Sequence, residues 1–132
     1  MIYVGLDVSG QNIVAYAVTE RKRCVFEGTG KPTRAGLRGL IQQLSGGAKL
    51  VAFEAGNQMK WIADTLQRLP DVQVHVVHPN EVKWITESRG KTDRLDAKKL
   101  AELARAGMLP RQVHVVEGPT RALRELASAR HQ

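Results

Sequence analysis

The sequence has only one cysteine, Cys24, in 132 residues. A single thiol cannot close an internal disulfide and cannot by itself build a thiolate metal site, so redox and structural-zinc chemistry are excluded. Long hydrophobic runs are also missing: each apolar stretch has only a few residues, whereas a helix needs roughly 20 to span a bilayer. The first residues, Met1 to Val4, lack the basic segment that opens a signal peptide. These absences predict a cytoplasmic protein that has no membrane partner.

Acidic residues are in the minority, and this imbalance indicates the kind of partner. The chain has 20 Lys and Arg against 13 Asp and Glu, which gives a formal net charge of +7. A charge of this sign and size is typical of a protein that meets a polyanion, so nucleic acid is the leading candidate. The length suits one ordinary domain that can bury a core of its own.

The first 30 residues have the pattern of an antiparallel meander. Residues 2–8 alternate apolar and other side chains with the period of a strand, 13–18 form a second apolar run, and 24–26 form a third that ends at Gly28. The links between these runs are too short for a parallel crossover, which needs a dozen or more residues. The three strands are therefore predicted to pair antiparallel.

From residue 33 onward the pattern alternates between helix and strand periods. We expect a helix between Thr33 and Gly46, a strand over 49–53, a helix carrying Trp61 to Leu69 and stopped by Pro70, a strand over 72–77, a short helix opened by Pro79, and a helix from Thr92 to Ala106. The economical arrangement is an α/β fold with one mixed five-stranded sheet flanked by helices. Strands one, four and five would be parallel, and strand two antiparallel to them.

Two acidic residues fall where strands end. Asp7 interrupts the most apolar strand of the chain, where burial of a lone carboxylate would cost several kcal/mol. Glu54 directly follows the strand over residues 49–53, and ligands collect at the carboxyl ends of parallel strands. If strands one and four are neighbours, the two carboxylates lie side by side. Alternatively, Asp7 caps the turn at Ser9 and Gly10, and Glu54 is a solvated acid at the start of a loop.

Asp93 and Asp96 are three positions apart within the last predicted helix. They would lie about 60° apart around its axis, and Leu100 and Leu103 each follow one of them by seven positions. Both acids would therefore prolong the apolar stripe and face the sheet. The competing explanation is that acids in a first turn suit the helix dipole, which accounts for Asp93 better than for Asp96.

Four carboxylates buried together would repel one another unless divalent cations occupied the space between them. Hard oxygen ligands select Mg²⁺ or Mn²⁺, and two such ions can clamp a scissile phosphate. The remaining 20 basic and nine acidic residues leave a net charge of +11 around this site. The nucleic-acid-binding candidates closest to it in sequence are Arg89, Lys91, Arg94, Lys98 and Lys99, although each could be an ordinary solvated charge.

The same residues occur in segments that resemble a known family. The segments are residues 2–9 (IYVGLDVS), 53–56 (FEAG), 78–80 (HPN) and 91–103 (KTDRLDAKKLAEL). Together they resemble the N-terminal domain of the DEDD insertion-sequence transposases, the IS110 family, which also contains the Piv-type DNA invertases. The resemblance covers roughly residues 1–110.

The resemblance implies a RuvC-like, RNase H-type domain over residues 1–110. In it, Asp7, Glu54, Asp93 and Asp96 match the catalytic, metal-binding tetrad. It further implies DNA recombination with guidance by a bridge RNA, a homo-oligomer in the full-length form, and a C-terminal domain with a serine nucleophile. Residues 111–132 would be a linker and the start of a helical region, with the serine domain outside this chain. The serines that would then be poor candidates for the nucleophile are Ser9, Ser45, Ser88 and Ser128.

Three other interpretations remain open at the level of sequence. Residues 5–10 (GLDVSG) also look like the first phosphate loop of the actin and sugar-kinase ATPases, although further phosphate loops are not visible. A stand-alone Holliday-junction resolvase of the RuvC type shares the chemistry and the approximate length. A non-catalytic DNA- or RNA-binding module would share only the charge. Metal-dependent cleavage or ATP binding by the chain would separate these classes.

Overall fold

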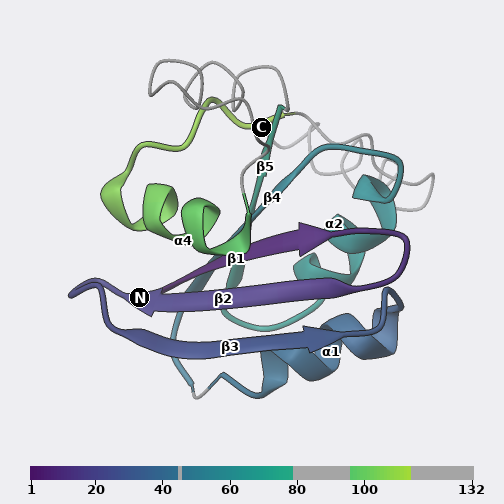
Figure 1. Ribbon diagram of the computed structural model, residues 1–132, viewed down its shortest axis with the longest axis horizontal. Coiled ribbons are helices and arrows are strands. Elements are labelled where there is room, and N and C mark those ends of the chain that lie inside the picture. The colour runs from purple at the N-terminus through teal and green to yellow at the C-terminus, as the bar shows by residue number, and fades with distance from the viewer. Residues whose placement is uncertain (45, 79–95, 114–132) are drawn as a thin grey trace, which may run out of the picture.

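The computed structural model describes residues 1–44, 46–78 and 96–113 (Figure 1). The chain begins with three strands, which are followed by alternating helices and strands. The elements in order are β1 (Ile2–Val8), β2 (Ile13–Thr19), β3 (Cys24–Gly30), α1 (Arg34–Gln42), β4 (Lys49–Glu54), α2 (Met59–Gln67), β5 (Val72–Val77) and α4 (Ala97–Ala106).

The five strands form one mixed sheet in the order β3-β2-β1-β4-β5. β2 runs antiparallel to both β1 and β3, whereas β1, β4 and β5 are parallel to one another. This arrangement confirms the predicted α/β fold of the RNase H type, with strand two antiparallel and helices flanking the sheet. It also confirms that strands one and four are neighbours.

One face of the sheet carries the main hydrophobic core. Val4 and Leu6 of β1 point to this face and pack with Leu37 of α1 and with Ile62 and Leu66 of α2, all at most 1% exposed. The period of two in β1 and the helical spacing of the leucines bring these side chains into one layer. Figure 1 shows α1 and α2 on this side of the sheet.

The opposite face is covered by α4, which packs directly on the backbone of β1. A Cβ atom added to Gly5 would lie 2.0 Å from the carbonyl oxygen of Ala97 and 2.7 Å from the amide nitrogen of Ala101. The helix can approach this closely only because position 5 has no side chain. A smaller apolar cluster of Val77, Leu100 and Leu103 completes this face.

The helix ends match the predicted capping residues at two of four positions in α1 and α4; α1 ends at Gln42, before the predicted Gly46. Thr33 caps α1, with its hydroxyl accepting a hydrogen bond from Gly36 N at 3.0 Å, and Gly107 ends α4 with a positive φ of 70°. The predicted start of the last helix at Thr92 is wrong, however. Asp96 has an extended backbone, so the helix begins at Ala97 and Asp96 is its N-cap.

The chain that follows α4 returns to the free edge of β5. Val113 N donates to Val76 O at 2.8 Å, Gln112 forms an isolated antiparallel bridge with Val77, and His75 Nε2 lies 2.8 Å from Pro110 O. These contacts attach residues 110–113 to the sheet. The predicted domain boundary after residue 110 stays a prediction, and the short helix predicted at Pro79 lies outside the described residues.

Candidate functional site

The register of the two central parallel strands brings Asp7 and Glu54 together. Leu6 of β1 is paired with Phe53 of β4, so the next residue of each strand is one of the two acids. Residues paired in parallel strands share a face of the sheet. Gly5 is paired with Ala52 and faces α4, and two positions further along each strand Asp7 and Glu54 lie on that same face.

Burial makes this pair of carboxylates costly without compensation. Both residues are half-buried, and the Oε1 atom of Glu54 is fully removed from solvent. Two neighbouring carboxylates in such a place repel each other and lose hydration, whereas a divalent cation between them reverses both effects. These oxygen donors therefore fit Mg²⁺ or Mn²⁺.

Asp96 reaches the same end of the sheet from another element. Its Oδ1 atom accepts a hydrogen bond from Lys99 N at 2.8 Å, and the residue is exposed. The contact between Gly5 and Ala97 holds this end of α4 over β1, two residues before Asp7. The argument that Asp96 prolongs the buried stripe of a helix is wrong, because Asp96 precedes the helix. Its position at this end of the sheet comes from the packing of α4 on β1 instead.

The structure brings together part of the predicted site. Asp93, Arg89, Lys91 and Arg94 lie outside the described residues. Within residues 1–44, 46–78 and 96–113, no group of three or more acidic, His or Cys side chains is close enough to hold a metal ion. The described part thus contributes the adjacent pair on β1 and β4 and a third carboxylate at the start of α4.

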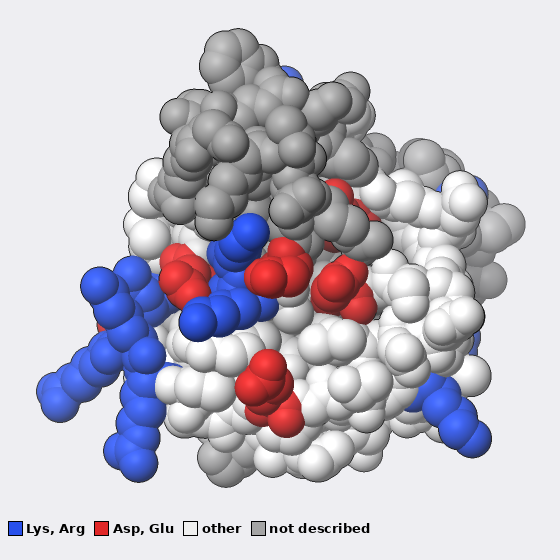
Figure 2. All heavy atoms as spheres, in the orientation of Figure 1, with Lys and Arg blue, Asp and Glu red and all other residues white. Residues whose placement is uncertain are grey.

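Two predicted nucleic-acid contacts lie directly beyond Asp96. Lys98 is exposed and Lys99 is half-buried, both in the first turn of α4. Figure 2 shows acidic and basic side chains intermingled over this helix and the adjoining strands. The positive charge therefore borders the carboxylates and does not form a separate surface at this point.

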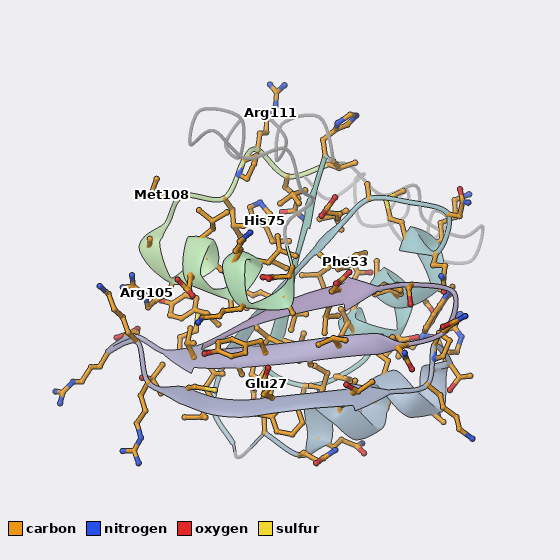
Figure 3. All side chains as sticks on the ribbon, in the orientation of Figure 1. Glu27, Phe53, His75, Arg105, Met108 and Arg111 are labelled. Carbon is orange, nitrogen blue, oxygen red and sulfur yellow. The ribbon has the colours of Figure 1, made fainter. Side chains whose placement is uncertain are left out.

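A second group of positive charges, which the sequence analysis did not select, lies at the other end of the sheet. Arg21, Lys22 and Arg23 are exposed in the turn between β2 and β3, beside the start of β1. Figure 2 shows basic side chains extending from this end, and Figure 3 places Arg105, in the last turn of α4, on the same side. The signal in the sequence was the run of three consecutive basic residues.

A cavity of about 350 Å³ opens beside Glu54 and was also missed. It is lined by residues 8–10, 54–59 and 62, which belong to the β1–β2 turn, the β4–α2 loop and α2. Gln58 Nε2 donates to Ser9 O at 3.3 Å and so joins the two loops. The turn-forming residues after Glu54 indicated a loop at this position. Sequence alone, however, does not show that this loop and the β1–β2 turn enclose a cavity.

Comparison with known families agrees with this geometry. The model of the DEDD transposase family of IS110 elements, described as "Transposase", matches residues 4–132. None of the curated proteins matches the chain. None of the helices that the structure describes is long and apolar enough to cross a membrane.

Proposed function

From the premise that the chain belongs to the IS110-type DEDD transposases, a family of DNA-acting enzymes, we propose that it performs metal-dependent phosphodiester chemistry on DNA. In this proposal Asp7, Glu54, Asp93 and Asp96 hold Mg²⁺ or Mn²⁺. The observation that carries it is the parallel register of β1 and β4, which puts Asp7 beside Glu54 with one Glu54 oxygen out of solvent.

Of the three described carboxylates in this proposal, two lie on strands of the sheet and one caps a helix. Asp7 and Glu54 are carried by the two central strands, so their backbone positions cannot shift without breaking the sheet. Asp96 uses Oδ1 to cap α4, and in this proposal its second oxygen binds the cation. When bound, the divalent cation would polarise the scissile phosphate and stabilise the leaving oxygen.

The charge distribution supports binding to a nucleic acid along the sheet. Lys98 and Lys99 adjoin the carboxylates, and the basic turn at residues 21–23 lies at the opposite end of β1. The seven residues of β1 span about 20 Å at about 3.3 Å each. A DNA strand or a guide RNA in the proposed complex can therefore be contacted at two separate points, and a homo-oligomer would multiply these contacts.

The serine near the site is a poor nucleophile. Ser9 Oγ accepts hydrogen bonds from Gln11 N at 3.3 Å and Asn12 N at 3.1 Å, and it donates to Asn12 O at 3.2 Å. These bonds hold the hydroxyl in its own turn. We propose that strand exchange uses a serine from a C-terminal domain outside residues 1–132, because religation requires a covalent intermediate that conserves the bond energy.

The position of Gly5 argues against the phosphate-loop interpretation of residues 5–10. Gly5 lies within β1 and is covered by α4, so its backbone does not border an open loop. The family match also separates the chain from a stand-alone resolvase. The transposase proposal accounts for both the carboxylate pair and the matched length.

Thermal unfolding with and without Mn²⁺ tests the metal site. Wild-type chain should melt at a higher temperature in millimolar Mn²⁺, because a cation that binds only the folded state stabilises it. Asp7→Asn and Glu54→Gln should each reduce this increase. The matched controls are Asp71→Asn and Glu27→Gln, which make the same chemical changes at exposed positions away from the site. Both controls should retain the increase in melting temperature caused by Mn²⁺. If Mn²⁺ does not change the melting temperature of the wild-type chain, the proposed metal site is wrong.

A denaturing gel tests whether a covalent link to DNA requires a serine domain outside residues 1–132. Residues 1–132 incubated with labelled DNA and Mg²⁺ should give no protein-linked band, whereas a protein extended by a serine domain should give one that depends on Asp7 and Glu54. A covalent band from residues 1–132 alone would show that the nucleophile has been misplaced.

A further inference from the structure

The cavity beside Glu54 is lined by residues that, apart from Glu54, take no part in the metal chemistry proposed above. It lies between the β1–β2 turn and the start of α2, at the edge of the sheet where β1 and β4 end. Its volume of about 350 Å³ is within the range of roughly 300–1,000 Å³ found for small-molecule pockets. It can therefore hold a group of the size of one nucleoside.

The lining of this cavity argues against an anionic occupant. No Lys or Arg is among the described residues that line it, and Glu54 contributes a carboxylate. Away from a cation at Glu54, a phosphate group in the cavity would find no positively charged side chain among the described lining residues. The remaining lining combines apolar side chains, including Met59 and the buried Ile62, with the amides of Asn57 and Gln58.

A flat neutral ring with polar edges matches this combination. Apolar side chains can contact the faces of a nucleobase, and Asn and Gln amides can pair with its donor and acceptor edges. We propose that the cavity binds one unpaired nucleobase of the DNA strand whose scissile phosphate would be bound by the divalent cation that Asp7 and Glu54 are proposed to hold. This inference rests on the proposed action on DNA and adds to it a base-binding subsite.

The glycines of the cavity provide a direct way to close it. Gly10 and Gly56 line the space from its two loops, and a Cβ atom at either position would meet no atom within 4 Å. Neither has the positive φ that makes a side chain strained. Leucine at position 56 or 10 should therefore be accommodated without a clash and add bulk at the wall of the cavity. Gly46 has the same freedom and does not line the cavity, so it is the matched control.

The experiment compares two fluorescein-labelled DNA strands by anisotropy in Mg²⁺. One strand consists of abasic deoxynucleotides with a single central adenine, and the other is entirely abasic. Stacking and edge contacts of one base should make wild-type chain bind the adenine strand about tenfold more tightly. Gly56→Leu and Gly10→Leu should abolish this preference and leave binding to the abasic strand unchanged. Gly46→Leu should retain both.

Two results would overturn the subsite. Equal binding of the two strands by wild-type chain would show that no base is recognised. A preference retained in both Gly56→Leu and Gly10→Leu, with unchanged melting temperatures, would place base recognition elsewhere on the chain. Failure of the proposed metal site gives a different result. In that case Mn²⁺ would not change the melting temperature, whereas the preference for the adenine strand is measured separately.

Discussion

The two faces of the sheet are built from side chains of different size. The face that α1 and α2 cover is filled by large apolar groups, such as Phe53, Leu37 and Ile62, all at most 1% exposed. On the other face, Gly5 meets the backbone of α4 at Ala97. Each large buried side chain stabilises the fold by about 1.5–3 kcal/mol, whereas contacts between small residues bury little area. The first face thus supplies most of the stability, whereas the second, with its smaller cluster of Val77, Leu100 and Leu103, supplies the position of Asp96.

This difference explains why the acids lie on the α4 side. A layer of large side chains keeps a helix and a sheet well apart, which would move a helix-end carboxylate away from the strands. The glycine and alanine contact lets α4 lie directly on β1. The candidate site therefore requires the close approach of α4 to β1. Mutations should be able to change this approach and the free energy of unfolding to different extents.

The largest expected effect is on the α1 and α2 face. Leu37→Ala should lower the free energy of unfolding by about 2–5 kcal/mol, because the side chain is fully buried and its removal leaves a cavity. Urea denaturation measures this loss. The increase in melting temperature caused by Mn²⁺ should persist in the fraction that folds, since α4 is untouched. Loss of that increase would show that the two faces do not act separately.

Gly5→Ala should have a smaller effect on stability and a larger one on the site. The new Cβ would overlap the Ala97 carbonyl, so α4 must shift at a cost of about 1–3 kcal/mol. The Mn²⁺-dependent increase in melting temperature should then fall, because Asp96 moves with the helix. Gly39→Ala is the matched control, since its Cβ would meet no atom and the change should slightly favour α1. An undiminished response to Mn²⁺ in Gly5→Ala would contradict the positioning role.

Two substitutions at Asp96 separate its capping role from its proposed metal role. Asp96→Ala removes the acceptor for Lys99 N and should cost about 1 kcal/mol of stability. Asp96→Asn retains a good N-cap, so its stability should stay close to wild type, but it removes the charge that a cation needs. Both variants should respond less to Mn²⁺. If Asp96→Asn responds like wild type, Asp96 acts only as a cap.

The smallest effect concerns an ion pair that joins α1 and α2. Arg34 Nη1 donates to Asp64 Oδ2 at 2.7 Å, and this hydrogen bond, together with Arg68, lowers the pKa of the Asp64 carboxyl below its ordinary 3.8. A depressed pKa stabilises the folded state above pH of about 4 and ceases to do so as the pH falls through the lowered value. Both partners are partly exposed, so the contribution should be under about 1 kcal/mol.

Asp64→Asn provides the measurement for this pair. Its urea midpoint should be slightly lower than that of wild type at pH 7, and the difference should shrink below pH 4. A difference that does not change with pH would assign the effect to lost hydrogen-bond geometry and not to charge. The pair lies on the stable face, so the response to Mn²⁺ should be unaffected.

The elements with a clear period were predictable from sequence. The alternation in residues 2–8 and the leucine spacing after Thr33 led to β1 and to α1 with its correct N-cap, because local sterics and one buried face determine both patterns. The start of α4 was not predictable in the same way. Asp93 and Asp96 fit a helical spacing, but Asp96 is extended, since a capping side chain competes with continuation of the helix.

The sequence by itself determined the sheet, its mixed direction and the presence of acids at strand ends, because these depend on short-range periodicity and on link length. Only the tertiary structure decided the register that pairs Leu6 with Phe53, the contact of Gly5 with α4 and the cavity between the loops that hold Ser9 and Gln58. Each of these joins segments that are tens of residues apart. Their meeting depends on the packing of whole elements, which no local pattern encodes.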